Sequence, residues 1–204
     1  ILNGVTVSGE TVIEKAAAES DMVRSTVQGI IKGSQVIKEV YDPLSGQGVV
    51  YVTVPLTGPN GALAALLPQV MPMMPPGMET AFAPPAGFAV DENYDGLIID
   101  ASDVPLKPAL INRVVTKDNE VVYDPSMVES GLLGQRGAAE YTDDIGKARE
   151  ILSARGAKNP LVVKAEGVVR STDAEVGTES AARIEASNKD GKFLENAKVV
   201  FVLQ

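Results

Sequence analysis

Gly96-Leu-Ile-Ile-Asp-Ala101 is an apolar run with Asp100 as its one polar residue, and such a run predicts a buried β-strand. Downstream of it, two further predicted strands at 109–116 and 120–123 flank a turn at 117–119, and together they predict a β-hairpin. The 96–101 strand therefore opens a stretch of regular structure that is expected to continue to the end of the chain.

The rest of this carboxyl-terminal half is expected to alternate helices and strands. Glycine permits tight backbone turns, and three glycines at three-residue spacing predict a loop before the first helix. The glycine-spaced loop contains Gly131, Gly134 and Gly137. The helix after it is expected to be capped by Thr142, to end at Gly156 and to bury a stripe of Ile145, Ala148 and Leu152. A strand at 161–169, a short helix at 179–187 and a closing strand at 197–203 are expected to follow.

The first 57 residues show a separate pattern of a strand, a long helix and a hairpin. Residues 3–8 alternate as a short strand, and apolar residues at three- and four-residue spacing predict a helix over 10–32 that ends at Gly33. Segments 35–41 and 48–55 are separated by turn-forming residues and predict a β-hairpin.

A proline- and methionine-rich segment, residues 58–90 and called the arm below, separates these two patterns. Six of the 13 prolines fall between Pro68 and Pro85, so the arm is expected to be neither helix interior nor sheet. Its apolar side chains need a surface to lie against, either in their own domain or on another subunit. The residues expected to make a subunit contact are Leu66, Leu67, Val70, Met71, Met73, Met74, Met78, Phe82 and Phe88.

These patterns predict an α+β fold of two small mixed helix/strand units, residues 1–57 and 91–204, joined by the arm. The first unit is expected to run strand, helix, hairpin, and the second strand, hairpin, helix, strand, helix, strand. The strongly apolar closing strand is expected to pair with elements of the first unit, which would make the two units one body.

The composition excludes several classes of active site. The 204 residues contain no His and no Cys, which excludes Ser-His-Asp and Cys-His catalysis, zinc fingers and disulfides. A net charge of −9 argues against nucleic-acid binding, because phosphate contacts need clustered Lys and Arg. No stretch approaches the roughly 20 apolar residues of a membrane-spanning helix. We therefore expect a protein that is not an enzyme and that uses no cofactor and no metal.

Three groups of residues have both a local and a functional interpretation. The glycine loop lacks the Lys-Ser/Thr of a phosphate-binding loop, and a tight turn explains it better. The acidic cluster at 91–103, with Asp95 and Asp100, has residue types that hydrolyse glycosides or bind Ca²⁺, but a solvated loop explains it better. The arm methionines have the thioether ligands of Cu(I), but adaptable packing explains them better.

Several motifs, in this order and spacing, carry a resemblance. They are Tyr94-Asp-Gly-Leu-Ile-Ile-Asp-Ala101, Lys107-Pro-Ala-Leu110, Glu120-Val-Val-Tyr123, Asn159-Pro-Leu-Val-Val-Lys-Ala165, Ala181-Ala-Arg-Ile-Glu-Ala186 and Phe193-Leu-Glu-Asn-Ala-Lys-Val-Val-Phe-Val-Leu203. Outside the arm, the chain resembles the bacterial envelope lipoproteins typified by the flagellar lipoprotein FlgP. The resemblance implies export to the periplasm or outer membrane, including the cell surface, and a structural role in rings or disks around the flagellar motor.

The same resemblance implies a lipid anchor in many members. The chain opens at Ile1 rather than at Met, so we expect a mature or trimmed fragment whose anchor lies upstream. Membrane contact is expected only through such an anchor.

The leading functional hypothesis is a structural protein of the bacterial cell envelope that assembles with copies of itself into a ring, disk or filament. Copies would pair through sheet edges, with the arm of one laid across its neighbour, and other envelope or flagellar proteins would be further partners. One alternative is a monomeric periplasmic binding module whose arm is a lid over a hydrophobic ligand. Another is a carboxylate-based hydrolase that uses Asp95 and Asp100.

Overall fold

The computed structural model describes residues 6–8, 11–12, 35–44, 47–53, 57, 61–63, 65–66 and 80–204. Near the amino terminus, β1 (Thr6–Ser8) pairs antiparallel with β2 (Thr11–Val12). The helix predicted over 10–32 is therefore wrong at its start, because two β-branched residues there pair as a strand. Residues 13–34 lie outside the described residues.

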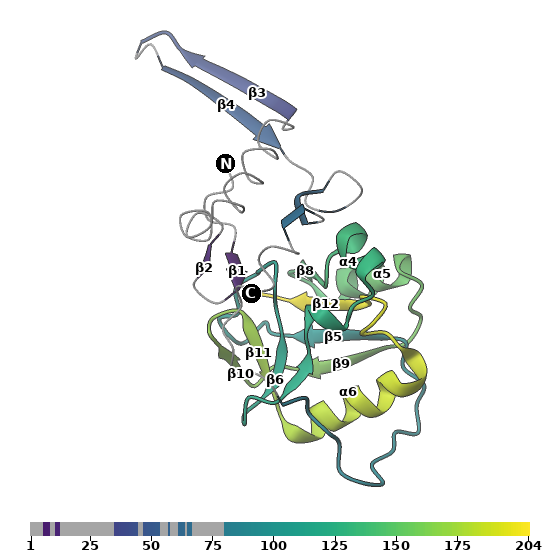
Figure 1. Cartoon of the computed structure of the whole chain (residues 1–204). Helices are drawn as coiled ribbons and strands as arrows, with labels where there is room; N and C mark the ends of the chain where they lie inside the picture. Colours follow the sequence, from purple (N-terminus) through teal and green to yellow (C-terminus); the bar gives the residue numbers. More distant parts are fainter. Residues whose placement is uncertain are drawn as a thin grey trace.

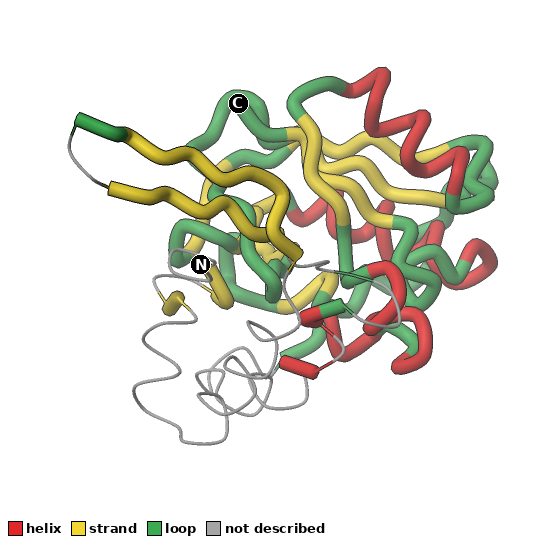
Figure 2. Tube along the Cα trace, turned by 90° about the horizontal axis from the view of Figure 1, so that it is seen from above, coloured by secondary structure: helices red, strands yellow, loops and turns green. Residues whose placement is uncertain are grey.

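The hairpin predicted at 35–41 and 48–55 is confirmed. Strand β3 (Gln35–Asp42) pairs antiparallel with β4 (Gln47–Thr53) along the whole of both strands, with one irregularity in the register. Figures 1 and 2 show this two-stranded hairpin, called the ribbon below, extending away from the rest of the described chain.

Strand β5 (Gly96–Asp100) lies inside a four-stranded parallel sheet, which confirms the buried strand predicted there. The strand order is β8 (Glu140–Thr142), β12 (Val199–Val202), β5 and β9 (Pro160–Lys164), and this sheet is called the central sheet. The position of β5 between two other strands satisfies the hydrogen-bonding groups on both of its edges.

Both faces of the central sheet are covered, which explains why β5 is apolar without alternation. Leu97 and Ile99 belong to the main core, which also includes residues of α6 (Thr178–Gly191) and of a second sheet. Ile98 points to the opposite face and packs in a smaller core beneath α5 (Ile145–Ala154). Figure 1 shows α5 and α6 on opposite sides of this sheet.

The second sheet has the strand order β10-β11-β6-β7. Its strands β6 (Val114–Thr116) and β7 (Val121–Tyr123) are antiparallel, which confirms the predicted hairpin. The strand predicted over 109–116 begins only at Val114, so the prediction is wrong over 109–113. The short 3-10 helix η2 (Pro125–Met127) follows the hairpin. Strand β11 (Asp173–Val176) lies parallel to β6 and antiparallel to the edge strand β10 (Gly167–Val169).

The single strand predicted over 161–169 is wrong, because its two halves, β9 and β10, belong to different sheets. The chain crosses between the sheets at two consecutive residues. The Ala165 N–H donates to the carbonyl of Asp100 in the central sheet at 2.8 Å, and the Glu166 N–H donates to the carbonyl of Glu175 in the second sheet at 2.8 Å. The two Val-rich segments of 161–169 therefore belong to different sheets although they are adjacent in sequence.

The two helices predicted beyond residue 140 are confirmed with shifted ends. Helix α5 is capped by Asp144, whose carboxylate accepts the Lys147 N–H at 2.8 Å, and not by Thr142. Two residues of its predicted stripe are fully buried, whereas Ile145 is 37% exposed. Gly156, with a φ of +81°, follows its end as predicted. Helix α6 is longer than the predicted 179–187.

The glycine loop predicted before α5 is wrong, because most of it forms helix α4 (Ser130–Arg136). Leu132 and Leu133 pack against the main core, and this tertiary contact outweighs the low helix propensity of glycine. Gly137 follows the helix with a φ of +73°, so this glycine does serve a turn.

The closing strand β12 pairs with β5 and β8, so the predicted pairing with the first unit is wrong. All four of its residues are buried, because it lies between two strands and under both layers. Parallel and antiparallel strands combined with helices give the α+β fold that the sequence predicts. Within the described ranges, no helix is long and apolar enough to cross a membrane.

Candidate functional site

The contact residues predicted in the arm fall into two groups. Leu66 and Phe82 are buried inside the chain itself, and Phe88 packs half-buried against the core that contains Phe82. These three therefore serve the packing of their own chain and do not form an exposed surface together. The other six predicted contact residues lie outside the described residues: Leu67, Val70, Met71, Met73, Met74 and Met78.

The end of the arm is attached to β7 by backbone hydrogen bonds. The Phe82 N–H donates to the carbonyl of Val121 at 2.8 Å, and the Val121 N–H donates to the carbonyl of Thr80 at 2.9 Å. Ala81 forms a parallel bridge with Val121. Residues 80–83 contain no proline, so their N–H groups are available to extend the second sheet beyond β7.

Most exposed large apolar side chains lie on the ribbon. Among the described residues, seven large apolar side chains are exposed, and six of them belong to the ribbon or its turn. Their exposed fractions reach 65% for Ile37, 68% for Tyr41 and 98% for Leu44. The six are Val36, Ile37, Val40, Tyr41, Leu44 and Tyr51.

Apolar residues occupy both faces of the ribbon. Val40 and Tyr41 are adjacent in β3 and therefore point to opposite faces. A register shift beside Lys38 leaves Ile37 as the extra residue of a β-bulge. Lys38 faces Tyr51 across the ribbon, with its Nζ 5.7 Å from the centre of the Tyr51 ring, so one face carries a cation–π pair.

The sequence predicts this hairpin but not its exposure. The signal is present in two adjacent apolar pairs, Val36-Ile37 and Val40-Tyr41, because adjacent strand residues point to opposite faces. A two-stranded sheet cannot cover either of its own faces. Such a pattern therefore predicts that other residues must cover the hairpin.

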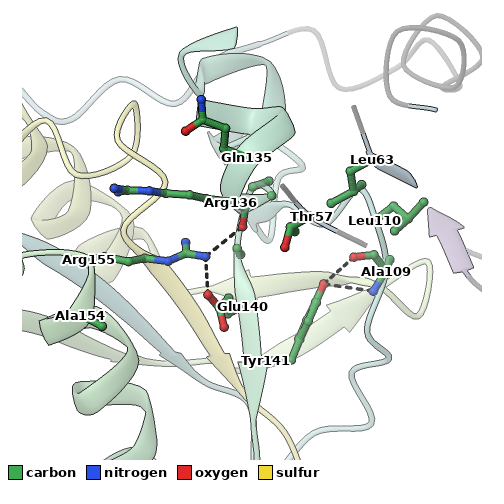
Figure 3. Close-up of a pocket in the computed structure, with 13 residues that line it drawn as sticks. Thr57, Leu63, Ala109, Leu110, Gln135, Arg136, Glu140, Tyr141, Ala154 and Arg155 are labelled. Carbon is green, nitrogen blue, oxygen red and sulfur yellow. Dashed lines mark hydrogen bonds and ion pairs between the residues drawn. The ribbon is translucent and has the colours of Figure 1, made fainter. Parts of the chain in front are cut away.

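A cavity of about 540 Å³ lies beside β8, at one edge of the central sheet (Figure 3). Its walls come from β8, the end of α4, the end of α5 and the segment at 109–110. Leu63 of the arm and Thr57 also line it. Figure 3 shows Leu63 and Leu110 together on one side, with Arg155 on the opposite side. The cavity thus has one apolar and one charged wall.

The charged wall is held by Arg155. Its Nη2 donates to the carbonyl of Arg136 at 2.9 Å and to Oε1 of Glu140 at 2.5 Å, and its Nη1 donates to the carbonyl of Ala197. The guanidinium therefore joins α4, β8 and the segment before β12. These contacts make Arg155 a structural cross-link, and Arg136 is a second cation among the lining residues.

The opposite end of the cavity is fixed by Tyr141. Its hydroxyl accepts the Ala109 N–H at 3.0 Å and donates to the Ala109 carbonyl at 2.9 Å. Burial raises the pKa of Tyr141 above its ordinary value, so the hydroxyl stays protonated at neutral pH. Tyr141 is thus a hydrogen-bonding anchor for the 109–110 segment and is poorly suited to act as a base.

The structure separates the carboxylates proposed for a hydrolase. Asp95 precedes β5 and accepts the N–H groups of Lys158 and Asn159, with its closest contact at 2.7 Å. Asp100 ends the same strand and accepts the Ser102 hydroxyl at 2.6 Å. Asp95 and Asp100 are five positions apart along an extended strand, which places their Cα atoms roughly 16 Å apart, beyond the spacing of any glycosidase pair. Both carboxylates hold turns, and the hydrolase pair is wrong.

In the described part of the chain, no group of three or more Asp or Glu side chains is arranged to hold a metal ion. Asp103, another member of the acidic cluster, forms an exposed ion pair with Lys164 at 2.5 Å. The arm methionines, considered as Cu(I) ligands, lie outside the described residues.

A buried charged cluster surrounds Arg113, although scattered Lys and Arg residues in the sequence predict surface charge there. Arg113 is buried, and its Nε lies 2.5 Å from Oδ2 of Asp124. Asp173 is fully buried nearby, and burial raises its pKa to about 6 while the charge of Arg113 partly offsets the rise. The cluster lies at one end of the second sheet, where Arg113 precedes β6, Asp124 follows β7 and Asp173 begins β11.

The family described as Treponema pallidum Tp0624, second domain, matches residues 96–204. The matched residues run from the first residue of β5 to the carboxyl-terminal end and contain both four-stranded sheets with helices α4, α5 and α6. The ribbon and the arm lie outside the match. No curated protein matches the chain. Because the match takes in more than half of the 204 residues, the chain belongs to the family of the Tp0624 second domain.

Proposed function

We propose that the protein is a non-enzymatic structural component of the bacterial cell envelope that associates with copies of itself. The observation that supports this proposal most strongly is the ribbon, which exposes apolar side chains on both faces. Contiguous apolar surface on a folded protein marks an interaction site more often than an accident of packing.

The ribbon is an energetically poor structure when it stands alone. A two-stranded hairpin is marginally stable in water, and three or more strands with a covered face are needed for independent stability. Each large apolar side chain that passes from water to a buried position contributes about 1.5–3 kcal/mol. Covering a few of the six exposed side chains on the ribbon would therefore stabilise both the hairpin and a contact between subunits.

The location and the partners follow from the sequence resemblance to the flagellar lipoprotein FlgP and its relatives. We propose a periplasmic or outer-membrane location, including the cell surface, with a lipid anchor upstream of Ile1. Other envelope or flagellar proteins would be further partners. The family match concerns a different protein, so the resemblance to FlgP stays a prediction.

Fewer residues of the arm are available to contact a neighbouring subunit than the sequence predicts. Leu66 and Phe82 are already buried in their own chain, so they are not free to cover a neighbour. The proposal accordingly assigns the main subunit contact to the ribbon. The contribution of residues 67–79 of the arm remains a prediction, because these residues lie outside the described ones.

The test is the mass of the particle in solution over a wide range of concentration, measured by sedimentation velocity. The double variant Ile37→Ser/Tyr41→Ser removes two of the most exposed apolar side chains, and we expect it to stay monomeric where the unmodified chain associates. Ile145→Ser is the matched control, since it changes an exposed apolar residue on α5. An unmodified chain that is monomeric at every concentration would contradict the proposal.

The cavity beside β8 favours a second candidate, the binding module for a hydrophobic ligand. Leu63, a residue of the arm, forms part of the apolar wall, as a lid residue would. Cavities of this volume are in the range that holds small ligands.

An environment-sensitive naphthalene sulfonate dye tests this second candidate. The variant Thr57→Trp would fill the cavity, and Lys117→Trp, in the exposed turn between β6 and β7, is its control. Saturable binding of one dye to a monomer, lost only in Thr57→Trp, would favour the binding module over self-assembly. Equal dye fluorescence in both variants would contradict the binding-module candidate.

A further inference from the structure

Resting on the self-association proposed above, we infer that two copies of this chain pair antiparallel along the outer edge of β3, with Val40 facing Val40 of the second copy. The two ribbons then form one four-stranded sheet in the order β4-β3-β3-β4. This arrangement supplies the additional strands that a two-stranded hairpin lacks.

The outer edge of β3 is open to a second copy. In the described part of the chain, the sheet that contains β3 consists of β3 and β4 alone. Residues 35–41 are all exposed, so neither sheet of the body covers this strand. An open strand edge presents a row of N–H and C=O groups, which is a template for one more strand.

Symmetry limits the ways in which β3 can pair with itself. Antiparallel strands at one edge are related by a two-fold axis perpendicular to the sheet, so the pairing is centred on one residue facing its own copy. A centre at Lys38 or at Glu39 places like charges opposite each other, which destabilises a sheet. A centre at Val40 places Lys38 opposite Asp42 on both sides of the axis and Glu39 opposite Tyr41.

The two neighbouring centres are also unfavourable. A centre at Ile37 coincides with the β-bulge, where the strand has an extra residue out of register. A centre at Tyr41 carries the pairing into Pro43, which has no N–H to donate. Like charges thus disfavour centres at Lys38 and Glu39, whereas the bulge and Pro43 disfavour centres at Ile37 and Tyr41. Val40 is the centre that avoids all of these costs, and this difference gives the pairing its specificity.

The extent of the contact sets its strength. Pairing over residues 38–42 buries less than the roughly 800 Å² per partner of a standard stable interface. The dimer is consequently expected to dissociate on dilution. In a larger assembly, apolar side chains on the faces of the four-stranded sheet remain available for further copies.

The absence of cysteine from the chain allows a direct test of the register. Facing residues of an antiparallel pair have Cα atoms about 4.5–5.5 Å apart, which is within the range that a disulfide spans. We expect Val40→Cys to form a disulfide-linked dimer on mild oxidation. Tyr51→Cys, on the strand away from the axis, and Lys117→Cys, on the body, are exposed controls that should stay unlinked.

Charge exchange tests the same register without a covalent bond. Lys38→Asp places two acidic residues opposite each other, and Asp42→Lys places two basic residues opposite each other. Each is expected to raise the dimer dissociation constant about tenfold. The double variant Lys38→Asp/Asp42→Lys restores both unlike pairs and should recover the affinity of the unmodified chain.

The outcomes separate this inference from the proposed function. Cross-linking at position 40 together with recovery in the double variant supports the register. Self-association without cross-linking at position 40, or without sensitivity to either charge change, overturns the register and leaves self-assembly intact. A chain that stays monomeric at every concentration overturns both.

Discussion

The central sheet and the ribbon are both built from apolar strands, yet their surroundings are opposite. Strand β5 is covered by α5 on one face and by α6 with the second sheet on the other. Strand β3 has comparable β-forming residues, but Ile37 and Tyr41 are mostly exposed. An apolar strand pattern thus predicts a strand, whereas the layers around it decide whether the strand becomes core or contact surface.

The largest expected effect comes from breaking the core under the central sheet. Phe201 of β12 is fully buried and stacks on Tyr141, with ring centres 5.6 Å apart. Phe201→Ala is expected to lower the free energy of unfolding by about 3–5 kcal/mol, because it leaves a cavity between packed layers. Denaturant titration measures this, and a loss below about 1 kcal/mol would show that the core is not tightly packed there.

The next effect concerns the buried charge of Asp173. Burial raises its pKa to about 6 in the folded chain, above the value of about 4 expected when unfolded. The folded state therefore binds the proton more tightly, and this group's contribution to stability is full below pH 4 and is lost as the pH rises through 6.

Asp173→Asn removes this loss, so it should raise the free energy of unfolding at pH 7 by about 3 kcal/mol and change little at pH 4. Unfolding titrations at both pH values check the sign. A variant that is less stable at pH 7 would mean that the attraction between Asp173 and Arg113 outweighs the cost of burial.

A smaller effect tests how the second face of the central sheet is covered. The Asp144 carboxylate caps α5 by accepting the Lys147 N–H. Asp144→Ala is expected to cost about 1 kcal/mol of unfolding free energy. Asp143→Ala is the matched control, because that residue does not cap α5: it makes an exposed ion pair with Lys147 and a long hydrogen bond with the Thr142 hydroxyl, which are worth little in stability. Equal losses in the two variants would argue that α5 needs no cap.

The smallest effect on folding is expected in the ribbon. Tyr41 is mostly exposed, so Tyr41→Ala should change the free energy of unfolding of the dilute chain by less than about 0.5 kcal/mol. The same substitution should weaken self-association measurably in sedimentation. A large loss of stability in the dilute monomer would show that Tyr41 contributes to the folded core, and it would contradict the assignment of the ribbon as a contact surface.

Sequence patterns were sufficient where the deciding interactions are local. Strand β5, the hairpins β3–β4 and β6–β7, and helices α5 and α6 follow from apolar runs, turn residues and caps a few positions apart. In the candidate site, the ribbon was predicted as a hairpin, but the exposure of its apolar side chains was not predicted. The cavity beside β8 was not predicted, because its walls come from segments as distant as Leu63 and Arg155.

The failures share a long-range cause. The glycines at 131–137 predicted a loop, but helix α4 forms there because Leu132 and Leu133 pack against the main core. The stretch over 161–169 divides between two sheets because Ala165 and Glu166 donate hydrogen bonds to different ones. Leu66 and Phe82, predicted to contact a neighbour, are buried because their own chain supplies the cover.

Local sequence patterns were enough to predict many of the strands and helices, the α+β class and the exclusion of His- and Cys-based chemistry, because propensity and periodicity act over a few residues and composition does not depend on the fold. Only the tertiary structure decided which apolar surfaces are covered. That outcome depends on segments tens of residues apart meeting in space, and it leaves β5 in a core and β3 at the surface.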